Sequence, residues 1–143
     1  MANMFTSYDT ERKTMPCSIL PPPPNGIKVL KNVKGETLGV QVDYSTPLQL
    51  YFHLEGVCNS DLEELSSGVT KFDILTTTHK KVFSKEYTTA EILNQETGDL
   101  FISLTADEMT TFKKETYTMR VTLTTVINSY EVFAEKDGYL VIR

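Results

Sequence analysis

The side chains best suited to catalysis or metal binding are two histidines and two cysteines, and their spacing does not bring them together. His53 falls on the polar phase of an alternating segment, and His79 falls in a polar segment typical of a hairpin tip. Zinc sites need several His or Cys ligands at short spacings, and a cysteine nucleophile needs a base beside it. Cys17 and Cys58 fall in different kinds of segment, which disfavours a disulfide. We expect no metal, no cofactor and no enzymatic activity.

Carboxylates are numerous, but those that stand close together fall in predicted turns. Asp61, Glu63 and Glu64 form one group, and Asp107 and Glu108 form another. A glycosidase needs only two well-placed acids and Ca²⁺ needs only loop oxygens, so the residue types alone exclude neither. The chain has no D-x-D-x-D-G run, no glycine-rich phosphate loop and no G-x-S-x-G elbow. We therefore interpret these acids as solvated side chains of turns.

The best-defined polar cluster lies between two alternating segments, within GDLFISLTADEMTTFKKETYTMRVTL (98–123). Thr105 and Glu108 have the spacing of a capping box, in which each side chain accepts a hydrogen bond from the other residue's backbone N–H. Tyr117 stands at the head of the next strand, where immunoglobulin-like domains often use a tyrosine hydroxyl to fix the preceding corner. We predict that Thr105, Glu108 and Tyr117 form a structural corner between two sheets.

The composition fits a single domain whose partners are proteins. A chain of 143 residues is long enough for one hydrophobic core. Its formal charge of −5, without basic clusters, argues against nucleic acid and anionic membranes as partners. No apolar run approaches the length of about 18 residues that spans a bilayer, and the start, MANMFTSYDTERKT, lacks the apolar region of a signal peptide.

From residue 27 onward, apolar and polar residues alternate with period two, which predicts strands with one buried face. Turn signals separate the strands, among them Lys34-Gly35, Ser66-Ser67-Gly68 and Lys136-Asp137-Gly138. Residues 60–65 are predicted to form one helical turn. Seven to eight short strands over residues 27–143 predict an all-β, antiparallel immunoglobulin-like β-sandwich. The clearest apolar series are Leu38, Val40, Val42, Tyr44; Leu48, Leu50, Phe52, Leu54; Leu100, Ile102, Leu104; and Tyr117, Met119, Val121, Leu123.

Residues 1–26 differ from the rest of the chain, because they contain five of its six prolines, including four in a row at 21–24. Consecutive prolines favour an extended polyproline II conformation, so this segment is predicted to be an extended arm with a stiff hinge. The alternative is a disordered tail, which is common at a terminus. Against that alternative, the arm carries six large apolar side chains that could dock on a partner protein: Met4, Phe5, Tyr8, Met15, Ile19 and Leu20.

Several segments together carry a resemblance to a known family. They are Gly35-Glu36-Thr37-Leu38, Ser67-Gly68 before residues 69–74, residues 97–105, residues 115–121 and residues 138–142. Their order resembles the immunoglobulin-like domain of tailed-phage virion proteins, notably the N-terminal domain of the baseplate upper protein family. The resemblance covers roughly residues 35–142. It implies a structural protein of the virion, assembled in the host cytoplasm.

The leading hypothesis is therefore a non-enzymatic component of a bacteriophage particle, either a capsid decoration protein or a tail-attached or baseplate protein. Its N-terminal arm would dock on neighbouring capsid or tail subunits, and open sheet edges would also allow homo-oligomers within the particle. The alternative is a module that binds carbohydrate or a cell surface. Its candidate aromatic contacts are Tyr44, Tyr51, Tyr87 and Tyr130.

Overall fold

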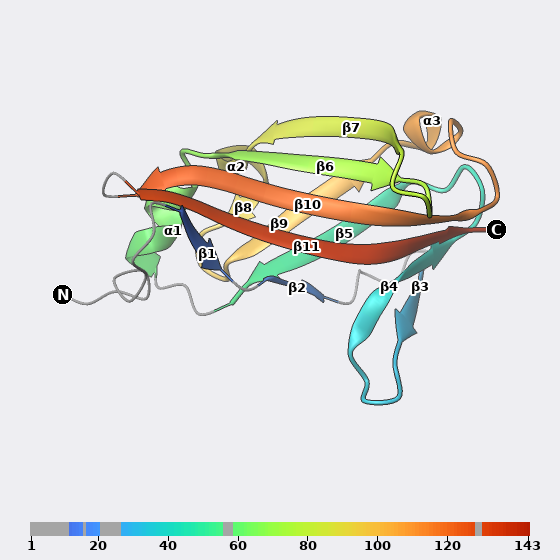
Figure 1. The fold of residues 1–143 in the computed structure, drawn as a ribbon, viewed down its shortest axis with the longest axis horizontal. Helices are drawn as coiled ribbons and strands as arrows, with labels where there is room; N and C mark the ends of the chain where they lie inside the picture. Colours follow the sequence, from blue (N-terminus) through green and yellow to red (C-terminus); the bar gives the residue numbers. More distant parts are fainter. Residues whose placement is uncertain (1–11, 16, 21–26, 56–58, 128–129) are drawn as a thin grey trace.

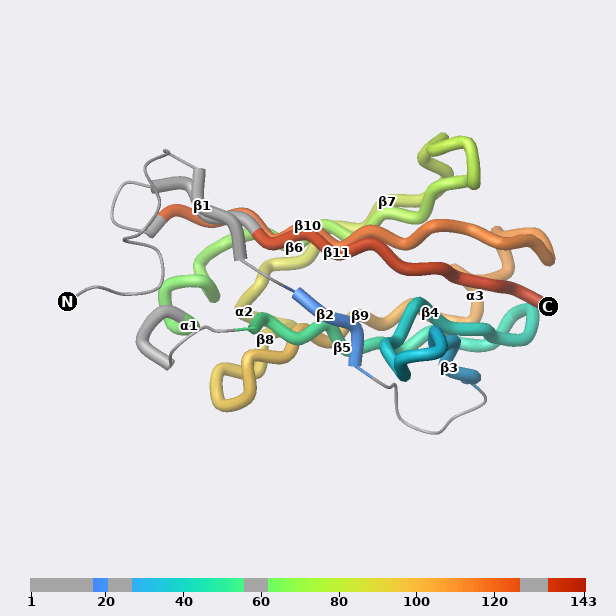
Figure 2. The backbone as a smooth tube through the Cα atoms, turned by 60° about the horizontal axis from the view of Figure 1, so that its bottom comes forward, coloured from blue at the N-terminus to red at the C-terminus, as the bar shows by residue number. Residues whose placement is uncertain are grey.

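Two β-sheets lie face to face along the long axis of the molecule (Figures 1 and 2). The computed structural model describes residues 12–15, 17–20, 27–55, 59–127 and 130–143. The fold is an immunoglobulin-like β-sandwich, so the predicted fold class is confirmed. Three short helices lie in the connections: α1 (Asn59–Leu65), α2 (Thr89–Ile92) and α3 (Ala106–Met109).

The larger sheet has the order β3-β4-β11-β10-β6-β7, and β1 also pairs with β11. The smaller sheet has the order β2-β5-β9-β8. β1 and β4 pair with β11 in parallel, whereas the other pairs are antiparallel. The strands are β1 (Arg12–Met15), β2 (Cys17–Leu20), β3 (Ile27–Lys31), β4 (Thr37–Val42), β5 (Leu48–Leu54), β6 (Val69–Leu75), β7 (Lys81–Thr88), β8 (Leu93–Asn94), β9 (Asp99–Leu104), β10 (Thr116–Ile127) and β11 (Tyr130–Ile142).

The core forms where the predicted alternation faces inward. In β5 the apolar positions Leu48, Leu50, Phe52 and Leu54 are buried, and the residues between them are half-buried on the outer face. Phe52 meets Phe72 of β6 across the sandwich, with ring centroids 6.5 Å apart. Burying each such side chain stabilises the fold by about 1.5–3 kcal/mol, so the alternation is sufficient to hold the two layers together.

The turn predicted at Lys136-Asp137-Gly138 is wrong, because β11 runs unbroken from Tyr130 to Ile142. Two contacts explain why residues 136–138 continue the strand. Asp137 accepts two hydrogen bonds from Arg120 of the neighbouring strand, at 2.8 and 3.0 Å. Gly138 packs so closely against the Ile19 Cδ1 atom that a Cβ would displace it. This glycine therefore marks a close approach between segments, not a turn.

The first apolar series is also only partly buried. Val40 and Val42 lie in the core, whereas Leu38 and Tyr44 are both 41% exposed. The hairpin formed by β3 and β4 projects away from the body of the sandwich in Figure 1, and Leu38 is the second residue of β4 after the turn of this hairpin. Gly39 is buried instead, because it lies against the backbone of Tyr139. The predicted helical turn at residues 60–65 is confirmed within α1.

The segment expected to be a free arm contributes two strands to the sandwich itself. β1 pairs with Glu131–Ala134 of β11, and β2 pairs with residues 51–54 of β5. The described residues form eleven strands, nine of them from residue 27 onward, where seven to eight were expected. The rest of the predicted arm, residues 1–11, 16 and 21–26, lies outside the described residues. The predicted boundary at residue 26 therefore does not separate all of the arm from the sandwich.

Candidate binding surfaces

The predicted capping box is formed at the corner between β9 and β10. The Glu108 N–H donates to Thr105 Oγ1 at 3.1 Å, and the Thr105 N–H donates to Glu108 Oε1 at 2.9 Å. The Lys85 ammonium of β7 also donates to Glu108 Oε1, at 3.2 Å. Burial raises the pKa of Glu108, but the hydrogen bonds from Thr105 and Lys85 outweigh it and leave the pKa lowered. The acid is held in place as a structural group.

Tyr117 closes the other side of the same corner. Its hydroxyl accepts a hydrogen bond from the Lys113 backbone N–H at 3.0 Å. Its ring packs edge-on against Phe112 at 5.5 Å between centroids, and Phe112 packs in the same way against Phe83. Burial raises the pKa of Tyr117. Thr105, Glu108 and Tyr117 thus lie around one connection that carries the chain from the smaller sheet to the larger one.

The two histidines lie on different parts of the sandwich. His53 lies on the smaller sheet, with Nδ1 2.7 Å from the Asp99 carboxylate. His79 lies at the tip between β6 and β7 with a φ of 67°, which fits the hairpin tip predicted there. Within the described ranges, no group of three or more His, Cys, Asp or Glu residues is placed to hold a metal ion. No helix of that part of the chain has the length and apolar character to cross a membrane.

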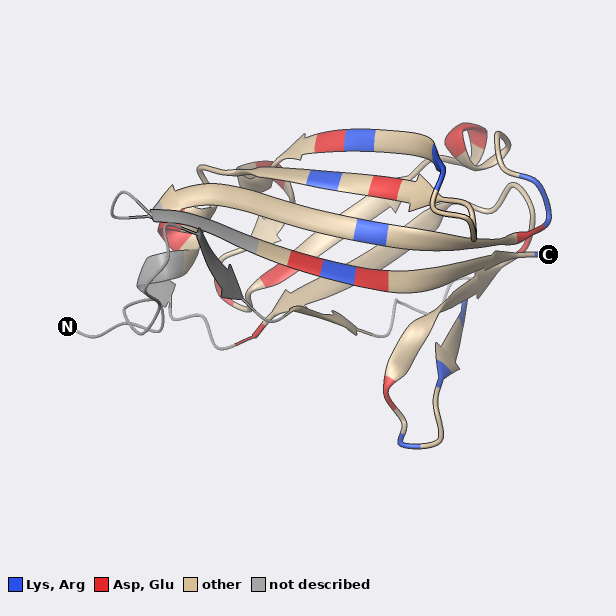
Figure 3. Ribbon diagram, viewed as in Figure 1, with Lys and Arg blue, Asp and Glu red and all other residues tan. Residues whose placement is uncertain are grey.

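Charges on the outer face of the larger sheet are interleaved. Figure 3 shows acidic and basic residues next to each other in the ribbons of β6, β7 and β11, and a basic residue in β10. Arg120 pairs with Asp137, and Lys81 Nζ lies 3.8 Å from Asp73, which also accepts a hydrogen bond from Ser84 at 2.6 Å. Such a mixed surface gives no single-sign field to attract a polyanion.

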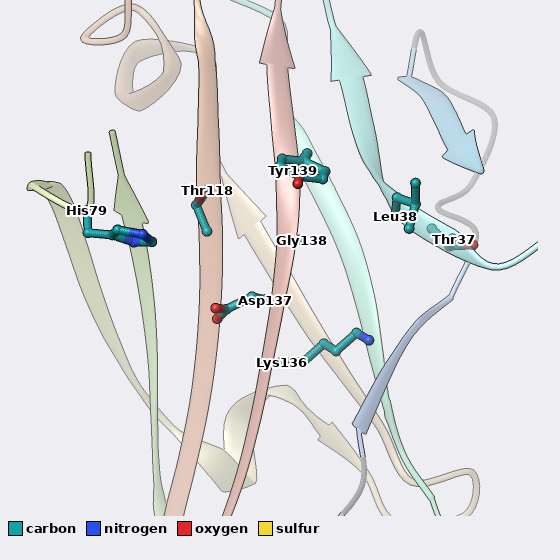
Figure 4. A pocket seen from close by; sticks show the side chains of 8 residues that line it. All are labelled: Thr37, Leu38, His79, Thr118, Lys136, Asp137, Gly138 and Tyr139. Atoms are coloured by element: carbon teal, nitrogen blue, oxygen red, sulfur yellow. The ribbon is translucent and has the colours of Figure 1, made fainter. Parts of the chain in front are cut away.

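A surface groove of about 310 Å³ opens beside Tyr139 on this sheet (Figure 4). Tyr139 is 51% exposed, and Figure 4 shows Asp137 and Lys136 pointing to opposite sides of β11. The exposed ring could stack on a ligand, whereas the Asp137 carboxylate already accepts hydrogen bonds from Arg120 and Thr118 lies between His79 and Tyr139 in Figure 4. The sequence did not predict the groove. A turn was expected at 136–138, so the side chains of this part of β11 were not assigned to the outer face of a strand. Its lining is Thr37, Leu38, His79, Thr118, Lys136, Asp137, Gly138 and Tyr139.

The tyrosines proposed as aromatic contacts mostly serve the fold. Tyr44 donates to the Thr110 carbonyl at 3.2 Å, and Tyr87 donates to the Ser103 carbonyl at 3.0 Å. Burial raises the pKa of Tyr87 to about 12. Tyr51 packs on Phe101 on the outer face of the smaller sheet, with centroids 5.0 Å apart. The side chain of Tyr130 lies outside the described part of the structure.

The six apolar side chains of the predicted arm have different positions. Met4, Phe5 and Tyr8 lie outside the described residues. The Met15 backbone pairs with Ala134, and Leu20 is half-buried opposite Tyr51. Ile19 is only 5% exposed and belongs to the main core, a position that does not fit docking on another protein while the segment stays in place.

The cysteines can be assigned only in part. Cys17 of β2 carries a free, half-buried thiol, and burial raises its pKa to about 12. Cys58 lies outside the described residues. A thiol with so high a pKa is almost wholly protonated near neutral pH, so Cys17 is a packing residue and not an activated nucleophile.

The comparisons with known proteins add no family. No family model matches the chain, and no curated protein matches it. Among solved structures, it is similar to AggA, the major subunit of aggregative adherence fimbriae type I from Escherichia coli, with 11% identity. That alignment covers 89% of this chain and 95% of the fimbrial subunit, with a TM-score of 0.28. The class of the protein, an immunoglobulin-like β-sandwich, is therefore defined by its own strands.

Proposed function

We propose that this chain is a non-enzymatic structural protein of a bacteriophage particle that docks on neighbouring virion subunits through its N-terminal arm. The observation that carries the proposal is the anchoring of residues 12–20, which place one strand in each sheet. An anchored base gives the preceding residues a fixed starting point on a rigid body. The sequence resemblance to virion domains supports the particle as the site of assembly.

The residues best placed to reach a partner precede β1. They include Met4, Phe5 and Tyr8, three large apolar side chains among eleven residues. β1 begins at Arg12 opposite Glu131, so residues 1–11 are joined to the sandwich beside β11. An extended segment can add to a sheet edge or lie in a groove of the partner, and alternate side chains then supply specificity.

The test replaces these three side chains in the full chain, as Met4→Ala, Phe5→Ala and Tyr8→Ala together. A truncation of residues 1–20 is unsuitable, because it would also remove Ile19 from the core. We expect unchanged thermal stability and at least a tenfold loss of incorporation into phage particles, measured by quantitative immunoblotting of purified virions. The matched control is Asn3→Ala, Thr6→Ala and Ser7→Ala. Equal incorporation of the two variants would refute docking through the arm.

A second candidate function, binding of carbohydrate, is favoured by the groove beside Tyr139. Sugars stack on aromatic rings and hydrogen-bond to polar side chains, and the lining of this groove includes the exposed Tyr139 together with His79 and Thr118. The test is a glycan array probed with the parent chain and with Tyr139→Ala, using Tyr44→Ala as the control on another exposed ring. A hit that survives Tyr139→Ala, or the absence of any hit, would count against this candidate.

A further inference from the structure

The segment formed by residues 12–20 contacts the sandwich from its edges. Among the described residues, β2 is the outermost strand of the smaller sheet and pairs with β5 alone. β1 extends the larger sheet beside the first part of β11, and β4 pairs with the last part of the same edge. The surfaces that receive the segment, one on β11 and one on β5, are therefore edges of strands that already belong to a two-layered core.

The side chain that fixes this segment is Ile19. It is 5% exposed and lies in a notch above Gly138, where a Cβ would displace its Cδ1 atom. The same notch is bounded by the Leu38 carbonyl and the Met119 methyl group, which lie 3.3 and 3.5 Å from the position of such a Cβ. Burial of the isoleucine side chain stabilises the contact, and both strands add backbone hydrogen bonds. We call the edges of β11 and β5 that receive residues 12–20 the slot. The segment and the slot thus have complementary surfaces.

Every copy of the chain carries both halves of this pair, joined only by residues 21–26. That linker contains Pro21, Pro22, Pro23 and Pro24. Four consecutive prolines favour an extended, stiff conformation of about 3.1 Å per residue. A flexible linker of this length would hold segment and slot at an effective concentration in the millimolar range, and stiffness that opposes the return lowers that value.

We propose that residues 12–20 exchange between copies of this protein, so that β1 and β2 of one chain occupy the slot on β11 and β5 of a second chain. The segment comes from a second copy of the same protein, because a segment that fits the slot of its own chain also fits the identical slot of another copy. The exchange preserves each contact of the segment, including Ile19 against Gly138, and changes only the chain that supplies it. The inference goes beyond the proposed function, since it concerns the purified protein and requires no phage component.

The direct test uses the native Cys17, which pairs in register with Leu54. A Leu54→Cys and Cys58→Ser variant can form a disulfide between positions 17 and 54, within one chain or between two. The full chain is unfolded in denaturant, refolded at about 10 μM and at about 1 mM, oxidised and analysed on non-reducing gels. An effective concentration of about 1 mM, the value for a flexible linker, would give about 1% interchain product at the low concentration and about half at the high one, and we expect at least these fractions. Intrachain product alone at both concentrations would overturn the proposal.

A second measurement does not depend on a substitution in the core. Two full-length copies carrying different affinity tags are refolded together at about 1 mM, diluted, and purified through one tag. We expect the second tag to co-purify, and to be absent when the copies are mixed after refolding. Replacing the four prolines by glycine should reduce co-purification severalfold, because a flexible linker favours return to the same chain. Equal co-purification from mixtures made before and after refolding, or none in either, would also overturn the exchange.

Discussion

The hydroxyl of Tyr117 gives the most stringent test of how the sandwich is held together. Tyr117→Phe keeps the ring that packs edge-on against Phe112 and removes only the acceptor of the Lys113 N–H, which donates to it at 3.0 Å. A backbone donor left without a partner in a partly buried site costs about 1–2 kcal/mol. For 143 residues, an unfolding entropy of about 2.1 cal/mol/K per residue corresponds to about 0.3 kcal/mol/K. We therefore expect the Tm to fall by about 3–7 °C.

The assay is urea denaturation followed by circular dichroism, with calorimetry for the Tm. Tyr139→Phe is the matched control, because it makes the same chemical change on a side chain that is half exposed. The control should stay within about 0.5 kcal/mol of the parent chain, as expected for a surface substitution. If the two variants unfold at the same urea concentration, the hydroxyl of Tyr117 does not secure the corner, and the account given for it is refuted.

Three further predictions concern packing, pH and thiol chemistry. Gly39→Ala should cost more than 3 kcal/mol in urea denaturation, because its Cβ would meet the backbone of the neighbouring strand, whereas Gly138→Ala should cost about 1 kcal/mol, because it meets the end of a side chain. The lowered pKa of Glu108 implies that it stabilises the fold above the ordinary value of 4.5 and that this contribution is lost as the pH falls through the lower folded value. Glu108→Gln should therefore flatten the stability profile below about pH 5, and Glu86→Gln, on the exposed face of β7, should not. Because burial raises the pKa of Cys17 to about 12 from 9.0, its alkylation in a Cys58→Ser background should be about a thousandfold slower in the folded chain than in urea, as followed by mass spectrometry.

The parts of the fold that the sequence predicts are those decided by neighbouring residues. Leu48, Leu50 and Phe52 alternate with polar residues and become the buried face of β5, because side chains of a strand point alternately to its two sides. Thr105 and Glu108 form their capping box from a spacing of three residues, without help from the rest of the chain. In both cases the physical cause lies within a few positions of the residues it acts on.

The parts that the sequence does not predict are decided by distant residues. Lys136-Asp137-Gly138 has the composition of a turn, yet it remains a strand because Arg120 binds Asp137 and Ile19 packs over Gly138. Ile19 is separated from this glycine by most of the chain, so no local pattern reports the contact. The groove beside Tyr139 was not predicted for the same reason, since its lining comes from the β6–β7 tip and from β4, β10 and β11.

For the N-terminal segment, the sequence does not predict which copy of the chain supplies the residues that the segment contacts. Its apolar side chains predicted docking on a partner protein, whereas Ile19 is buried in the core of the chain's own sandwich. The sequence indicates that such a side chain is buried against other residues. It does not indicate which chain supplies those residues, because the site on β11 and β5 is identical in every copy. Contact energies cannot distinguish the two arrangements, because own and neighbouring slots make identical contacts with Ile19. The choice is set by effective concentration, and therefore by the proline linker and by how closely copies are held together. If the chain is a subunit of a particle, as proposed above, neighbouring copies held side by side would shift the balance towards exchange without any change in the sandwich.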